Sequence, residues 1–283
     1  MTRTRWTNFD LIFFDCDSTL STIEGIDELA RLKGKEVRVS VLTDKAMNGE
    51  LDLSQVYGKR LKAIRPTLGQ LKEVEELYAQ TIVEDAPEVI ACLQFLKKDV
   101  FIISGGLVDA VRGFGRKLGV DADHIRAVEL EYNELSGEWW RYNEPQAQHQ
   151  KTYLEYVEGP LTESTGKTRI IQELSKGRNG RKMMIGDGSS DLATAPNVDL
   201  FVGYGGVVAR AKVKKDSEVF VQTPSLAPIA VLAAGAVGYE KVKGTRFQAV
   251  YEKGIRLIRE SDVFFKEAES RESFLSLFDM QES

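Results

Sequence analysis

The sequence predicts an α/β fold: a Rossmann-like parallel sheet core with helices on both faces, plus an inserted helical cap. Short apolar runs alternate with segments of helical periodicity, which is typical of a parallel sheet. Residues 22–85 interrupt this alternation, because their apolar residues fall at helical spacing and form no strand-like run. Acidic or glycine-containing turns follow several apolar runs, at the ends of strands where such sheets bind ligands.

Short apolar runs are expected to form the strands of the sheet, buried on both faces. These runs are residues 11–14, 100–103, 183–185 and 200–202, and residues 218–221 are expected to add another strand. Helical patterns lie between them, at residues 107–118 and 168–174, and a further helix is expected to begin at residues 191–195.

The interruption divides the chain into three parts. A catalytic core is expected to comprise residues 1–21 and 86–235, with a helical cap at 22–85 inserted after the first strand. Gly34, Gly49 and Pro66 punctuate the cap. The charged, helix-prone residues 236–283 are expected to form a C-terminal helical extension, to which the sequence assigns no role.

A β-hairpin is expected within the second half of the core. Residues 128–132 alternate in polarity, Ser136-Gly137 is a turn signal, and residues 138–142 are expected to return as the second strand. In this interpretation Trp139-Trp140 packs in the hairpin, with an interface or a substrate lid as the alternative. The polar run 143–150 is expected to be a surface loop.

Composition and charge limit the classes of function. The 283 residues are 42% hydrophobic and 29% charged, which is ordinary for a soluble globular protein. The net charge of −5 and the lack of a basic patch argue against nucleic-acid binding. The longest apolar stretch, 226–237, contains Pro228 and is too short to cross a membrane. Two cysteines, Cys16 and Cys92, lie in apolar runs and favour a reducing, cytoplasmic setting. A homodimer is also considered.

The strongest chemical signal is the pair Asp15 and Asp17, which follows the strand 11–14 directly. Two carboxylates at the end of a buried strand cost free energy unless a metal or a reaction uses them. One can attack phosphorus while the other handles protons. The alternative is a polar turn that caps the next helix.

Two further strand ends carry related signals. The run GDGSSD at 186–191 supplies Asp187 and Asp191, whose oxygens suit Mg²⁺; an ordinary Asp-Gly turn is the alternative. Ser104-Gly105-Gly106 follows the strand 100–103, and its hydroxyl and backbone N–H groups can bind an anion. By itself the Ser-Gly-Gly run is weak evidence for an anion site, because such runs are common in loops.

Lys167 stands at the start of a helical pattern, where its ammonium can neutralise phosphate or an attacking carboxylate. A solvated surface lysine is the alternative. Gly166-Lys167-Thr168 also resembles the end of an ATP-binding P-loop, but the earlier glycine of that motif is replaced by Leu161, so a P-loop is rejected.

Together, these four elements resemble the motifs of the haloacid dehalogenase superfamily of phosphatases over roughly residues 9–222. In that superfamily Asp-x-Asp-x-Thr, a Ser or Thr, a Lys and Gly-Asp-x-x-x-Asp follow in the same order. A closer resemblance is to its phosphoserine phosphatase family, through residues 14–20, 24–30, 162–167 and 201–206.

The resemblance implies a role for each matching residue. Asp15 is implied as the nucleophile and Asp17 as the general acid and then the base. Mg²⁺ is implied at Asp15, the backbone carbonyl of Asp17 and Asp187, with Asp191 supporting the site. The residues implied to bind phosphate are Ser104, Gly105, Lys167 and Ser190, the last standing where the family usually has Asn or Thr.

In the cap, the resemblance implies that Glu24 meets a substrate ammonium and Arg60 grips a substrate carboxylate, and Met47 is expected to line the same pocket. A guanidinium matches a carboxylate in a bidentate way. From the pattern alone, Glu24 equally fits a helix cap, Arg60 a solvated residue and Met47 the cap core.

The resulting expectation is a Mg²⁺-dependent phosphomonoester hydrolase that works through an aspartyl-phosphate and converts O-phospho-L-serine to serine and phosphate, as in serine biosynthesis. Two alternatives stay open. One is a phosphatase or phosphotransferase for another small phosphate monoester, and the other is a non-catalytic, metal-dependent binding module.

Overall fold

The computed structural model describes residues 8–279, so the first seven residues of the expected core and the last four of the extension lie outside it. Its strands are β1 Leu11–Phe14, β2 Asp99–Leu107, β3 Ile125–Val128, β4 Leu130–Asn133, β5 Thr152–Tyr156, β6 Lys182–Gly186, β7 Leu200–Tyr204, β8 Val219–Val221 and β9 Val263–Phe265. Its helices are α1 Gly25–Leu32, α2 Glu36–Met47, α3 Leu53–Ile64, α4 Leu68–Gln80, α5 Ala86–Phe95, α6 Val108–Lys117, α7 Pro145–His149, α8 Gly166–Ser175, α9 Ser189–Leu192, α10 Ala211–Asp216, α11 Ala227–Val242, α12 Gln248–Arg259 and α13 Ala268–Asp279.

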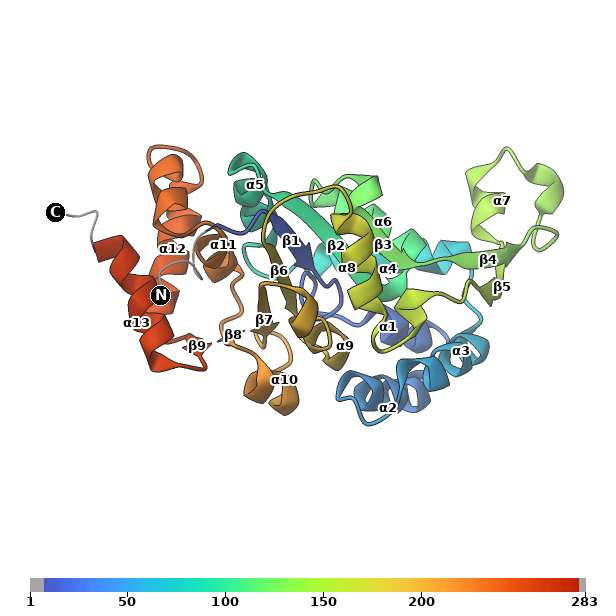
Figure 1. Ribbon diagram of the computed structural model, residues 1–283. Coiled ribbons are helices and arrows are strands. Elements are labelled where there is room, and N and C mark those ends of the chain that lie inside the picture. Colours follow the sequence, from blue (N-terminus) through green and yellow to red (C-terminus); the bar gives the residue numbers. More distant parts are fainter. Residues whose placement is uncertain (1–7, 280–283) are drawn as a thin grey trace.

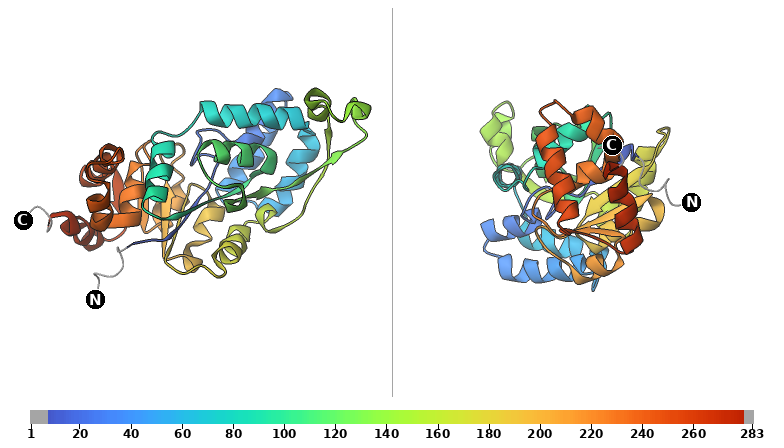
Figure 2. Two further views of the ribbon diagram at one scale, coloured as in Figure 1. Left: turned by 90° about the horizontal axis from the view of Figure 1, so that it is seen from above. Right: turned by 90° about the vertical axis from the view of Figure 1, so that its left-hand side faces the viewer.

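The central element is a seven-stranded sheet in the order β3-β2-β1-β6-β7-β8-β9, parallel except at β9 (Figures 1 and 2). All four residues of β1 are buried, as expected for a strand covered on both faces. Helices pack on both faces of the sheet, so the expected Rossmann-like α/β core is confirmed. The five expected strands all form, with small differences at their ends.

The segment 22–85 contains the helices α1–α4; α2 contacts α9, and α4 contacts α6. Side chains cap the N-termini of two of these helices, α3 and α4: at α3, the Asp52 side chain accepts from the Ser54 N–H at 2.9 Å. At α4, Thr67 and Gln70 form a reciprocal capping box. We propose that this segment is the cap of the molecule.

The strand β2 runs through Ser104, Gly105 and Gly106, although the sequence predicted that these residues follow the strand. Its pairing with β3 shifts register between Ile103 and Leu107. A β-bulge of this kind redirects backbone and side chains at the end of a strand. The expected helix then follows as α6.

The hairpin prediction is wrong in its second strand. The strand β4 pairs with β5, at residues 152–156, rather than with residues 138–142. Trp139 and Trp140 lie in a short 3-10 helix and are 51% and 60% exposed, so they do not pack in a hairpin. The expected surface loop 143–150 contains the helix α7 instead. The chain that follows the turn signal at Ser136-Gly137 therefore does not pair with β4 until residue 152.

The sequence predicted a helical C-terminal extension, but the extension also contains a strand. The helix α11 continues past residue 236, with a kink at Gly235, whose φ of 56° is in the left-handed region. After α12 the chain adds β9 antiparallel to β8, so the extension supplies an edge strand of the sheet. Among residues 8–279, no helix is both long and apolar enough to cross a bilayer.

Candidate active site

The parallel register brings the polar ends of β1, β2 and β6 to one edge of the sheet. Phe14 pairs with Ile102 on one side and with Ile185 on the other. The residues that follow these positions therefore emerge side by side. Ser18 has a φ of 51°, a left-handed conformation that turns the chain sharply after Asp17.

Three carboxylates converge at this edge. Oxygens of Asp15, Asp187 and Asp191 all lie within 4.8 Å of one another, and the three residues are 5%, 1% and 0% exposed. Burial, and next the charge of Asp15, raise the pKa of Asp187 to about 6 and the pKa of Asp191 to about 8. Such a cluster of desolvated like charges is costly without a cation.

The donor set fits a hard divalent cation. Carboxylate oxygens are the ligands that Mg²⁺ prefers in proteins. Within the described chain, the buried Oδ1 of Asp15 receives no well-aligned hydrogen bond, although Lys167 Nζ lies 2.7 Å away. This oxygen meets the Lys167 ammonium and keeps a lone pair that fits an ion.

Lys167 enters the cluster from the first turn of α8. Its Nζ lies 2.7 Å from Asp15 Oδ1 and 2.6 Å from Asp191 Oδ1. Burial opposes its charge, but the two carboxylates outweigh burial and raise the pKa of Lys167 above its ordinary value. Gly166 permits this approach, since a Cβ there would lie 1.5 Å from the carbonyl oxygen of Pro160.

Asp191 contacts both Lys167 and the loop that follows β6. Its Oδ1 accepts from Lys167, and its Oδ2 accepts from the N–H of Gly188 at 3.0 Å. Both oxygens are therefore already engaged with the protein. This geometry suits a residue that positions the lysine and the loop beside the cation.

Asp17 is held by donors from the cap and the core. Its Oδ1 accepts from the Tyr78 hydroxyl at 2.6 Å and from the N–H of Gly25 at 2.7 Å. Ser104 Oγ lies 3.3 Å from its other oxygen. Burial, and next the charge of Asp15, raise the pKa of Asp17 despite the hydrogen bonds. A raised pKa suits a carboxyl group that carries a proton to a leaving group.

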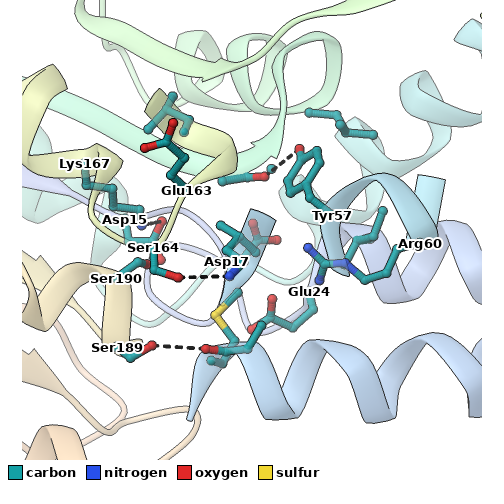
Figure 3. A pocket seen from close by; sticks show the side chains of 18 residues that line it. Asp15, Asp17, Glu24, Tyr57, Arg60, Glu163, Ser164, Lys167, Ser189 and Ser190 are labelled. Atoms are coloured by element: carbon teal, nitrogen blue, oxygen red, sulfur yellow. Dashed lines mark hydrogen bonds and ion pairs between the residues drawn. The ribbon is translucent and has the colours of Figure 1, made fainter. Parts of the chain in front are cut away.

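Most of the expected site residues line one pocket between core and cap (Figure 3). Those that line it are Asp15, Asp17, Glu24, Met47, Arg60, Gly105, Lys167 and Ser190. The other three, Ser104, Asp187 and Asp191, are buried next to these lining residues. In Figure 3, Lys167, Asp15 and Ser190 lie on the side opposite to Arg60, Tyr57 and Glu24.

The cap end of the pocket contains groups of both charges. Arg60 is 3% exposed, its guanidinium carbon lies 5.4 Å from the Tyr57 ring centroid, and its Nε has no hydrogen-bond partner among the described residues. Glu24 accepts from the Ser18 hydroxyl at 2.9 Å. Burial, and next the charge of Asp17, raise the pKa of Glu24 well above its ordinary range.

A further buried cation of the site, Arg210, was not predicted from the sequence. Its Nε donates to Asp187 Oδ2 at 3.0 Å, and its Nη2 lies 3.6 Å from Glu24 Oε1. Arg210 therefore links the carboxylate cluster to the acidic group of the cap. Its only sequence signal was its position in the segment after the strand 200–202, where an arginine usually faces solvent.

Two tyrosines of the site were also missed. Tyr78 reaches Asp17 from α4, and the Tyr57 hydroxyl donates to the carbonyl oxygen of Gly105 at 2.9 Å, joining cap to core. A tyrosine at helical spacing is usually core, so the pattern gave no separate signal for either.

Comparison with protein-family models matches residues 9–199 to a haloacid dehalogenase-like hydrolase. A phosphoserine phosphatase from Mus musculus is 32% identical over 213 residues, which cover 75% of this chain and 88% of that protein. One from Methanocaldococcus jannaschii is 28% identical over 223 residues, covering 77% of this chain and 95% of its own.

Solved structures give the same similarity. A phospho-aspartyl intermediate analogue of phosphoserine phosphatase superposes with a TM-score of 0.66 at 25% identity, covering 79% of this chain and 98% of that one. A substrate-bound phosphoserine phosphatase complex also has a TM-score of 0.66 at 25% identity, covering 79% of this chain and 97% of that one.

Proposed function

Since the chain belongs to the haloacid dehalogenase-like hydrolase family and is a phosphoric monoester hydrolase, we propose that it hydrolyses O-phospho-L-serine with the help of Mg²⁺. Phosphoserine phosphatases are its relatives over most of its length, and one similar solved structure is a substrate-bound phosphoserine phosphatase complex. A small phosphorylated substrate is thus supported by the comparisons, and phosphoserine is the finer proposal.

The observation that carries the proposal is the division of the pocket into two ends of different chemistry. One end has Asp15 and Lys167, and the other has Glu24 and Arg60. Phosphoserine has a phosphate at one end and an ammonium and a carboxylate at the other. A carboxylate and a guanidinium are the complementary partners for those two charges.

The proposed chemistry begins with Asp15. One of its carboxylate oxygens attacks phosphorus, the bond from phosphorus to the serine oxygen breaks, and Asp17 gives its proton to that oxygen. Water then attacks the aspartyl-phosphate, Asp17 takes a proton from the water, and Asp15 and inorganic phosphate are released. Lys167 offsets the charge of the phosphate oxygens and keeps Asp15 in place.

For the cation, we propose Asp15, the backbone carbonyl of Asp17 and Asp187 as ligands, with Asp191 as support. When bound, the ion offsets the repulsion between a phosphate dianion and the attacking carboxylate. Ser104, Gly105 and Ser190 are proposed to complete the phosphate end. Of these, Ser104 contacts Asp17, so it also orients the acid.

The test is a panel of phosphate monoesters assayed for phosphate release with and without Mg²⁺. We expect O-phospho-L-serine to have the highest kcat/KM and activity to vanish in a chelator. Arg60→Met is expected to lower kcat/KM for phosphoserine roughly 100- to 10,000-fold, the scale of two charge-assisted hydrogen bonds. The exposed Lys62, on the same helix, gives the matched control Lys62→Met, which is expected to behave as wild type.

A different monoester with a clearly higher kcat/KM would overturn the substrate proposal and favour the alternative of another small phosphate ester. Transfer of phosphate to an added alcohol in preference to water would favour a phosphotransferase. We also propose a cytoplasmic setting, which fits the two free, buried thiols of Cys16 and Cys92. The homodimer stays a prediction, and light scattering of the purified chain would test it.

A further inference from the structure

Three cap helices contribute one residue each to a hydrogen-bonded chain behind the pocket. Arg60 Nη1, from α3, donates to Thr43 Oγ1 at 3.1 Å. Thr43, from α2, donates to Asp27 Oδ1 of α1 at 2.8 Å. Thr43 and Arg60 are 1% and 3% exposed. Resting on the proposed function, we infer that Thr43, backed by Asp27, is a positioning residue that orients Arg60 for the substrate carboxylate.

A hydroxyl is the group that this position requires. A guanidinium has five donors and no acceptor, so Thr43 must accept from Arg60 and send its own proton elsewhere. Two oxygens lie within reach of that proton: Asp27 Oδ1, and the carbonyl oxygen of Val39 at 3.2 Å. Asp27 is closer, and its carboxylate is the stronger acceptor. The direction of the chain is thereby fixed.

The spacing also keeps Arg60 available. Asp27 acts on Arg60 through Thr43, and no carboxylate in residues 8–279 forms a direct ion pair with Arg60. A direct pair would occupy the donor face that a substrate carboxylate needs. Thr43 therefore holds one terminal nitrogen from behind while the remaining donors stay free.

The geometry of the pocket agrees with this role. Arg60 lines the pocket and Thr43 does not, so Thr43 acts through the arginine rather than on the substrate. Arg60 Nε is buried without a partner, and the Tyr57 ring lies against the guanidinium. With the ring on one side and Thr43 at one nitrogen, the guanidinium plane is held in one orientation.

The test compares two substrates that differ by one group. O-phospho-L-serine has the carboxylate, and O-phosphoethanolamine lacks it. Thr43→Val keeps the shape of the side chain and removes the hydroxyl. We expect its kcat/KM for phosphoserine to fall roughly 10- to 100-fold, mainly through KM, which is the scale of a lost hydrogen bond to a charged group. Its kcat/KM for phosphoethanolamine should stay within roughly twofold of wild type.

Three further variants sharpen the test. Thr43→Ser restores the hydroxyl and is expected to restore the preference for phosphoserine. Thr223→Val makes the same change at a buried threonine outside the pocket and should leave both substrates unaffected. If Thr43→Val does not fold, Asp27→Ala removes the far end of the chain and should lower the phosphoserine preference in the same direction.

The outcomes separate this inference from the proposed function. Wild-type enzyme that does not prefer phosphoserine to phosphoethanolamine would overturn both. Wild-type enzyme that prefers phosphoserine, beside a Thr43→Val or Asp27→Ala variant with an unchanged preference, would overturn only the role of Thr43. Equal losses on both substrates that serine does not restore would mean a purely structural role and would also overturn it.

Discussion

Removing or adding Mg²⁺ should change the stability of this protein measurably, because the carboxylate cluster is buried and only partly neutralised. Asp15, Asp187 and Asp191 are met by two cations, Lys167 and Arg210. At a free Mg²⁺ concentration of 100 times its Kd, a ligand that binds only the folded state adds about 2.7 kcal/mol to the free energy of unfolding. Divided by the unfolding entropy of 283 residues, this added free energy corresponds to a rise in Tm of roughly 4–5 °C.

The size of the Mg²⁺-dependent rise in Tm should depend on pH. The pKa of Asp187 is raised to about 6 and that of Asp191 to about 8, both above the ordinary value of 3.8. A carboxyl with a raised pKa stabilises the fold below its unfolded pKa and loses that contribution as pH rises through its folded pKa. Metal-free protein should therefore become less stable between about pH 4 and pH 8. The gain from Mg²⁺ should be larger at pH 8 than at pH 6.

Thermal melts in chelator and in Mg²⁺, at both pH values, are the assay. Asp187→Asn should abolish most of the Mg²⁺-dependent rise, whereas Asp216→Asn, at an exposed aspartate of α10, should keep it. A response of Asp187→Asn to Mg²⁺ equal to that of wild type would refute the reasoning. A wild-type Tm that saturating Mg²⁺ leaves unchanged would refute it as well.

Three other predictions follow from single contacts. Tyr78→Phe removes a donor to Asp17 and should lower kcat roughly 10-fold with little change in KM, so an unchanged kcat would count against Asp17 as the acid. Gly166→Ala adds a Cβ 1.5 Å from the Pro160 carbonyl oxygen and should lower kcat roughly 100-fold by moving the start of α8; near-normal turnover would contradict this. Phe274→Ala, at a fully buried position of α13, should lower the free energy of unfolding in urea by about 3–5 kcal/mol and leave kcat unchanged. A decrease below about 1 kcal/mol would show that the extension adds little to stability.

The sheet and the convergence of its acidic strand ends could be predicted from sequence for a simple geometric reason. Buried parallel strands appear as short apolar runs, and their carboxyl ends must share one edge. Asp15 and Asp187 each follow such a strand, the family resemblance implied that they share an ion, and their oxygens do lie together. Lys167 was weaker evidence alone, since only the family motifs set it apart from a surface lysine.

The hairpin shows where local signals fail. A turn signal and alternating polarity identify neighbouring strands only when the partner follows at once. Here β4 pairs with residues 152–156, whose Tyr153 N–H also donates to the carbonyl oxygen of Pro66 in the cap. That long-range contact stabilises the true partner and leaves no trace in the sequence near residues 138–142.

Arg210 and Thr43 could not be found by pattern because their roles depend on burial between distant elements. Arg210 contacts a carboxylate that follows β6 and lies near another from the cap, far away in the chain. Thr43 is one of many threonines until α1 and α3 bring Asp27 and Arg60 to its hydroxyl. Such positions become visible only once the helices are packed.

The most direct measurement is acid-quenched labelling with phosphoserine that carries a radioactive phosphate, followed by peptide mapping. If Asp15 takes up the phosphoryl group, one acid-stable label that hydroxylamine releases will map to the peptide containing residues 11–14 and that aspartate, and Asp15→Asn will carry none. Steady phosphate release with no trapped label, or a label on any other side chain, would contradict the account.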